Sequence, residues 1–220
     1  MKKVGVILSG CGFLDGAEIH ESVLTLLALD RLGAEALCAA PNVAQMHVVN
    51  HLTGDVAAGE SRNVLVESAR IARGKARDVA TVRADELDAL ILPGGYGAAK
   101  NLSDFAVKGA DATVHPDVLR LVREVHAQRK PLGFVCIAPA VAAAIFRGTS
   151  VSPRLTIGSD DETASALRKM GARHVDHPTE EVEVDEANRI VSTPAYMTAR
   201  GIGEAAKGID LLVTKVLELT

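Results

Sequence analysis

Strand-like and helix-like patterns alternate along the whole of this chain, and this alternation limits its fold more than any other feature. Short apolar runs are followed by stretches whose apolar residues recur at helical spacing. Two strands separated by a helix are joined as parallel neighbours through a crossover connection. Residues 4–9 are almost uniformly apolar, as expected of a strand that helices cover on both faces. The sequence therefore predicts an α/β protein with a mainly parallel sheet.

The pattern predicts one flavodoxin-like three-layer sandwich, with helices on both faces of the sheet. No linker, repeat or low-complexity tract divides the chain, so residues 1–220 are expected to form a single domain. Residues 48–49 are interpreted as a short strand. The expected strands cover residues 4–9, 35–40, 88–92, 131–135 and 154–158, followed by a hairpin of 182–185 and 189–192. The expected helices cover residues 18–32, 62–73, 118–126, 138–146, 161–170 and 202–219.

Charge and hydropathy exclude several classes of function. A net charge of −4 and a pI near 6.0 leave no basic face for nucleic acid, so a small-molecule substrate is expected. No apolar run approaches the roughly 20 residues that span a bilayer, so no membrane partner is expected. The apolar run at residues 4–8 is too short for a secretory signal and is interpreted as a core strand, which predicts a cytoplasmic protein.

The three cysteines, Cys11, Cys38 and Cys136, are far apart and lack C-x-x-C spacing. They predict neither a disulfide framework nor a zinc site. Cys38 is assigned to the core. His47 and His51 have i, i+4 spacing, but the apolar residues between them indicate a strand rather than a helix, so no metal site is expected.

Cys136 has the most informative surroundings, within residues 132–140 (LGFVCIAPA). An apolar strand ends at the cysteine, and Pro139 is placed for the first turn of a helix. The sulfur then lies at the positive end of the helix dipole, which favours thiolate over thiol. An isolated cysteine is more often a buried small hydrophobe. Ligands bind at the carboxyl ends of parallel strands, however, and this position predicts a nucleophile.

Two other loops are expected at the same edge of the sheet. Residues 93–97 (PGGYG) follow a strand, and the N–H groups of Gly94 and Gly95 are candidates to stabilise an oxyanion. Asn101 follows closely and is a candidate ligand contact. Glu21 lies at the start of the first helix, where burial beside the cysteine would raise its pKa and let it move protons. Glu18 is the competing carboxylate, but it is better placed to interact with the dipole of the first turn.

Several of these motifs together resemble a known family. The first-helix glutamate, residues 93–95 (PGG), 100–103 (KNLS) and 136–139 (CIAP) resemble the PfpI superfamily, which has the class I glutamine amidotransferase-like fold. The likeness to its ElbB branch, bacterial relatives of a vertebrate mitochondrial protein, covers nearly the whole chain. That closer likeness rests on residues 10–12 (GCG), 18–21 (EIHE), 50–54 (NHLTG), 62–65 (RNVL) and 193–197 (TPAYM).

The resemblance implies a homodimer without metal or cofactor and a glutathione-independent glyoxalase activity, a lyase of the hydro-lyase type. The implied substrate is a small dicarbonyl, glyoxal, which would be converted to glycolate. By position, Cys136 is the nucleophile and Glu21 the carboxyl group that hydrogen-bonds it. The backbone N–H groups of Gly95 and Ile137 would form the oxyanion site.

One departure from the family pattern bears on the activity. Superfamily members that act as proteases or strong glyoxalases often have histidine directly after the cysteine, and this chain has Ile137. This difference argues most strongly against a protease or an amidotransferase, because the histidine of their catalytic triad is missing. A non-enzymatic thiol sensor or regulator, connected to isoprenoid metabolism by the resemblance alone, remains the alternative, with Cys136 as the oxidised residue.

Overall fold

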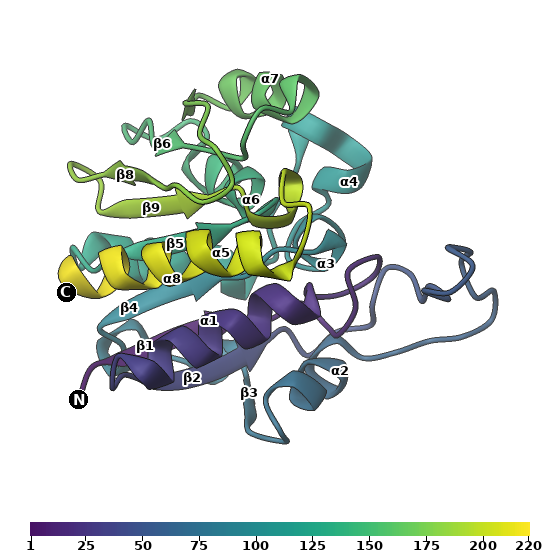
Figure 1. Cartoon of the computed structure of the whole chain (residues 1–220). Helices are drawn as coiled ribbons and strands as arrows, with labels where there is room; N and C mark the ends of the chain where they lie inside the picture. The colour runs from purple at the N-terminus through teal and green to yellow at the C-terminus, as the bar shows by residue number, and fades with distance from the viewer.

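The computed structural model describes all 220 residues and confirms the flavodoxin-like α/β fold (Figure 1). The main sheet holds β1 (Lys3–Ile7), β2 (Glu35–Ala40), β3 (Ala76–Asp78), β4 (Ala89–Leu92), β5 (Leu132–Val135), β8 (Glu183–Asp185) and β9 (Ile190–Thr193). Its strand order is β3-β2-β1-β4-β5-β9-β8. All neighbours pair in parallel except β8, which is antiparallel to β9 and forms with it the expected hairpin.

Helices cover both faces of this sheet and complete the three layers (Figure 1). They are α1 (Ile19–Arg31), α2 (Val64–Ile71), α3 (Tyr96–Lys100), α4 (Phe105–Lys108), α5 (Pro116–Ala127), α6 (Ala138–Phe146), α7 (Asp161–Lys169) and α8 (Ile202–Glu218). One apolar cluster lies between the sheet and α1, α2 and α8, and the other between the sheet and α5 and α6. None of the helices combines the length and hydrophobicity needed to cross a bilayer.

The central strand β4 shows why the buried runs of this sequence are continuous rather than alternating. All four of its residues are buried. Leu90 and Leu92 pack into the cluster beneath α5 and α6, whereas Ala89 and Ile91 pack into the cluster beneath α1 and α8. Successive side chains of a strand point to opposite faces, so a strand covered on both sides must be apolar throughout.

The ends of α1 follow from its sequence. The Glu18 carboxylate accepts a hydrogen bond of 2.6 Å from the backbone N–H of Glu21 and caps the first turn. Gly33, with φ of +70°, allows the chain to leave the helix in a left-handed conformation and turn into β2. The cap directs the first turn of α1, and with it the Glu21 side chain, toward the end of the sheet where β4 and β5 finish.

Two predicted strands are shorter than expected. Residues 154–158 form only the two-residue β6 (Arg154–Leu155), which pairs with β7 (Arg173–His174) in a separate sheet. Beyond it, the N–H of Thr156 donates to the side-chain hydroxyl of Ser192 in β9 rather than to a backbone carbonyl, which ends the β-ladder. The 48–49 run makes a single bridge, Val49 to Val56, within a long excursion between β2 and α2 (Figure 1).

The carboxyl ends of β1, β4, β5 and β9 meet at one edge of the sheet. Parallel strands place the loops that follow them side by side. The loop after β9 leads into a short 3₁₀ helix, η4 (Ala195–Met197). Four segments that are distant in sequence therefore converge where the candidate residues lie.

Candidate active site

Cys136 occupies a sharp turn between β5 and α6. Its φ is +61°, in the left-handed region that residues other than glycine seldom adopt. The backbone N–H of Cys136 donates to the carbonyl of Thr193, 2.9 Å away, so β5 and β9 stay paired up to the turn itself. Such strain persists where the surrounding structure enforces it and is concentrated at functional sites. The predicted strand-to-helix turn is present, with a backbone conformation that no sequence pattern indicated.

Glu21 is fully buried, and its carboxylate receives hydrogen bonds from two separate loops. The N–H of Gly94, after β4, donates to Oε2 at 3.0 Å, and the N–H of Tyr196, in η4, donates to Oε1 at 3.2 Å. The thiol of Cys136 lies beside the same carboxylate, and the two groups shift each other's pKa. The structure thus places the predicted pair, Cys136 and Glu21, side by side.

Burial sets the proton affinities of this pair. Loss of solvent, reinforced by the neighbouring Glu18 charge, raises the pKa of Glu21 to about 7, although the hydrogen bonds to its carboxylate act in the opposite direction. Burial and the Glu21 charge likewise raise the pKa of the Cys136 thiol above its usual range. The expectation that the helix dipole holds Cys136 as a thiolate is therefore wrong. The sulfur keeps its proton, and Glu21 is placed to accept it.

Two backbone N–H groups, those of Gly95 and Ile137, point at the Cys136 sulfur and favour its ionised form. They are the two groups expected to form an oxyanion site, and the structure places both beside the nucleophile. Gly94 has a different role from the one predicted, because its N–H is occupied by Glu21. It must nevertheless be glycine, since a Cβ there would lie 2.5 Å from the Cβ of Cys136 and 2.6 Å from Oε2 of Glu21.

Asn101 does not line the site, in contrast to the prediction that it contacts substrate. Its side chain is buried, and its amide nitrogen donates to the carbonyls of Ser9 at 2.8 Å and Asp15 at 2.9 Å. Its amide oxygen accepts from the N–H of Met46 at 3.0 Å. Every polar atom of this side chain is used to hold the loop after β1 and the excursion after β2. Asn101 is therefore a structural residue.

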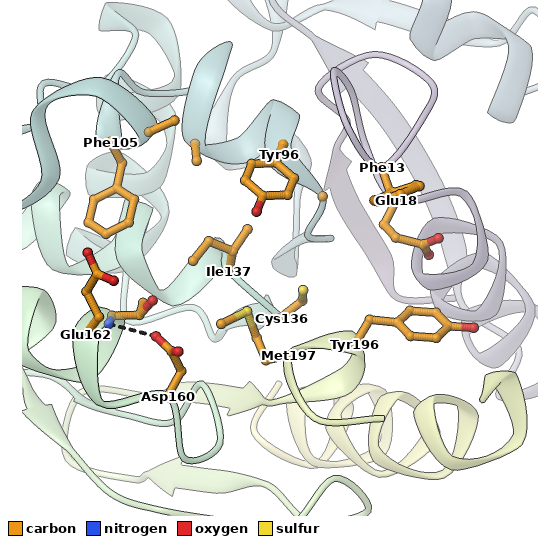
Figure 2. Close-up of a pocket in the computed structure, with 14 residues that line it drawn as sticks. Phe13, Glu18, Tyr96, Phe105, Cys136, Ile137, Asp160, Glu162, Tyr196 and Met197 are labelled. Atoms are coloured by element: carbon orange, nitrogen blue, oxygen red, sulfur yellow. Dashed lines mark hydrogen bonds between the residues drawn. The ribbon is translucent and has the colours of Figure 1, made fainter. Parts of the chain in front are cut away.

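Cys136 borders a cavity of about 510 Å³ (Figure 2). Ile137 also contributes to its wall, and Glu21 is fully buried beside Cys136, next to this wall. Carboxylates at the wall come from Glu18, Asp160 and Glu162. The larger apolar and aromatic side chains of the wall are those of Phe13, Tyr96, Phe105, Tyr196 and Met197.

Tyr196 is the functional residue that sequence reasoning missed, although residues 193–197 formed part of the family resemblance. Its backbone holds Glu21, its side chain lines the cavity, and its hydroxyl lies 2.8 Å from Nδ1 of His20. No strand or helix pattern could connect η4 with α1, which is 175 residues earlier. The order of strands in the sheet, with β9 next to β5, is what brings them together.

The remaining candidates have simpler roles. Cys38 is buried in the core, as predicted, while Cys11 is half-buried in the loop after β1. No group of three or more His, Cys, Asp or Glu side chains is arranged to hold a metal ion. His51 contacts the loop after β1, where its Nε2 accepts a hydrogen bond of 3.2 Å from the N–H of Leu14.

Comparisons with known proteins identify close relatives. No family model matches the chain. It is 48% identical to the human mitochondrial glutamine amidotransferase-like class 1 domain-containing protein 3, and the match covers 99% of this chain and 83% of that protein. The mitochondrial ES1 protein homolog of rat is 46% identical, with 99% and 84% covered.

Similar proteins are also found among the solved structures. A crystal structure from Ehrlichia chaffeensis, described as an isoprenoid biosynthesis protein with an amidotransferase-like domain, superposes with a TM-score of 0.92 at 40% identity. The match covers 99% of this chain and all of that one. DJ-1beta of Drosophila melanogaster shares the fold, with a TM-score of 0.56 at 21% identity.

The comparisons contradict one expectation. Relatives from human, rat and zebrafish are all named mitochondrial, which conflicts with the prediction of a cytoplasmic protein. That prediction rested on the first apolar run being a core strand. The run is indeed β1, but a core strand is needed for folding in any compartment and carries no information about location.

Proposed function

Because this chain belongs to the ES1 and ElbB family of glutamine amidotransferase-like proteins with the DJ-1/PfpI fold, we propose that it is a cofactor-independent glyoxalase. The substrate would be glyoxal or another small 2-oxoaldehyde, and the product the corresponding 2-hydroxy acid. The observation that carries the proposal is the buried pair formed by the Cys136 thiol and Glu21, whose pKa is about 7, beside a cavity that opens to solvent. A carboxyl group with this pKa can both accept and return a proton at neutral pH.

The first step forms a bond between the Cys136 sulfur and one aldehyde carbon. The thiol proton passes to Glu21, and the electron pair of the carbonyl bond moves to its oxygen. The N–H groups of Gly95 and Ile137, which already point toward the sulfur, are near the position where this charge develops. Return of the proton from Glu21 to the oxygen gives a neutral hemithioacetal.

The second step moves hydrogen between the two carbons. Glu21 removes the proton from the carbon that carries sulfur and passes it to the neighbouring carbonyl oxygen, and an enediol forms. Glu21 then takes the hydroxyl proton of the sulfur-bearing carbon and returns it to the neighbouring carbon, which yields a thioester on Cys136. Water attacks the thioester, the carbon–sulfur bond breaks, and the hydroxy acid leaves while Cys136 regains its proton. One carbon is oxidised and the other reduced, so no external oxidant or reductant is required.

Glycolate formation from glyoxal, without added metal or glutathione, tests this proposal. We expect wild-type turnover, and a loss of about 100-fold or more in both Cys136→Ala and Glu21→Gln, since each removes a group that acts directly on the reacting atoms. Circular dichroism of both variants controls for folding. Equal activity in Cys136→Ala would refute the mechanism. An inactive wild type whose Cys136 is oxidised to sulfinate by peroxide would instead favour the thiol-sensor alternative.

A further inference from the structure

The cavity beside Cys136 carries charge of one sign only. Glu18, Asp160 and Glu162 line it, and no lysine, arginine or histidine does. Figure 2 shows Asp160 and Glu162 on one side of Cys136 and Glu18 on the other. A substrate in this cavity therefore meets carboxylates at the wall and no cationic side chain.

Hydrogen bonds hold two of the three carboxylates in place, and the third, Glu162, is exposed to solvent. Glu18 caps α1 through the N–H of Glu21, and Asp160 caps α7 through the N–H of Thr163 at 2.8 Å. The hydrogen bonds from Thr163 lower the pKa of Asp160, so it is negative at neutral pH. Lys100 does not line the cavity. Its Nζ donates to the carbonyl of Leu14 and lies 5.2 Å from the centre of the Tyr96 ring.

The cavity is also large and apolar for a two-carbon substrate. Its volume of about 510 Å³ falls within the range of roughly 300–1,000 Å³ typical of sites for drug-sized ligands. Phe13, Tyr96 and Phe105 supply aromatic rings to its wall (Figure 2). Glyoxal has only four non-hydrogen atoms and would leave most of this surface without a contact.

We propose that the cavity selects 2-oxoaldehydes with an apolar or aromatic body and a neutral or cationic end, and that it discriminates against anionic ones. The proposal rests on the function proposed above and specifies its substrate class. The aldehyde end would meet Cys136 and the body would contact the aromatic side chains. Carboxylates at the wall repel a carboxylate or phosphate on the substrate and attract a cation.

A labelling experiment tests the charge preference without requiring turnover. Cys136 is modified with two methanethiosulfonates, the cationic trimethylammonioethyl and the anionic sulfonatoethyl reagent. Mass spectrometry of the Cys136 peptide measures the rate of each modification. Each rate is divided by the rate at which the same reagent modifies free 2-mercaptoethanol. We expect the cationic reagent to be favoured at least tenfold. We expect the triple variant Glu18→Gln, Asp160→Asn, Glu162→Gln, which keeps both caps, to lose most of this preference.

Asp161→Asn is the matched control, because Asp161 is in the same first turn of α7 but does not line the cavity. It should leave the preference unchanged. Equal normalised rates for the two reagents, or a preference that the triple variant retains in full, would overturn the inference.

Turnover of phenylglyoxal and of its 4-carboxy and 4-trimethylammonio derivatives completes the test, since the three share one electrophile. We expect kcat/KM to be lowest, by tenfold or more, for the 4-carboxy compound. Comparable kcat/KM values for all three would overturn the inference and leave the proposed glyoxalase function intact. No turnover of any 2-oxoaldehyde, with the labelling preference present, would instead overturn the glyoxalase function and support the charge selectivity of the cavity.

Discussion

Glu21 makes the stability of the folded protein depend on pH. An unfolded glutamate ionises near pH 4.5, whereas buried Glu21 holds its proton up to about pH 7. Between these values the folded state binds more protons, so its stability falls as pH rises. The difference corresponds to about 3 kcal/mol. We expect the unfolding free energy of Glu21→Gln, relative to wild type, to increase by about that amount between pH 4 and pH 8.

Urea unfolding at several pH values measures this shift. Glu186→Gln is the matched control, because it removes the same charge from an exposed turn. Its difference from wild type should stay nearly constant with pH. A constant difference for Glu21→Gln as well would mean that Glu21 ionises in the folded protein as it does in the unfolded chain.

Gly94 provides a second test at the level of single residues. A methyl group there would overlap Cβ of Cys136 and Oε2 of Glu21, at 2.5 and 2.6 Å. We expect Gly94→Ala to separate the pair and to lower kcat/KM by about 100-fold or more, since a displacement of about 1 Å is enough for such a loss. Gly203→Ala, where nothing lies within 4 Å of the added carbon, should retain full activity. Wild-type activity in Gly94→Ala would show that contact between Cys136 and Glu21 is dispensable.

Among the elements, Asn101 connects the loop after β1 with the excursion after β2. Asn101→Ala leaves two buried carbonyls and one N–H without partners, at about 1–3 kcal/mol each when they stay dry. We expect a destabilisation of about 3 kcal/mol in urea unfolding and faster hydrogen exchange at the Met46 amide. Ser61→Ala, an exposed site in the same excursion, should change stability by about 0.5 kcal/mol or less. Unchanged exchange at Met46 would contradict this role.

The long apolar elements could be predicted from sequence because continuous apolar residues indicate a buried strand or helix. The strand at residues 35–40 and the helix at 138–146 have the predicted bounds. The strand β3 was missed because its three residues, Ala-Arg-Asp, carry no apolar pattern, and its parallel pairing with β2 defines it instead. The short α3 was missed because it follows directly on the glycine turn after β4.

The sequence predicted which residues lie together where the order of strand ends decides it. It did not predict their hydrogen-bond partners. Cys136 and Glu21 could be paired because the loops after parallel strands meet at one edge. Asn101 bonds to backbone groups of distant loops, and the Gly94 N–H bonds to the Glu21 carboxylate; no sequence pattern indicates either contact. The protonated state of Cys136 was missed because burial and the Glu21 charge outweigh the backbone N–H groups that favour the thiolate.

For the whole molecule, we expect a homodimer, as the family resemblance implies. Light scattering or sedimentation should give twice the 23.0 kDa mass of one chain. Measurement over a range of protein concentrations distinguishes a stable dimer from weak association. A mass of one chain at all concentrations would contradict the expectation.

Because four loops converge on Cys136, its surroundings are completed only late in the synthesis of the chain. Tyr196, whose backbone fixes Glu21, is translated 60 residues after position 136, which takes roughly 3–12 s at about 5–20 residues per second. Until then β9 is absent, Glu21 lacks one of its two backbone donors, and the turn lacks its bond to Thr193. In the nascent chain Cys136 is therefore an ordinary cysteine. It becomes the nucleophile of the site only after β9 and η4 have been synthesised and have folded beside β5.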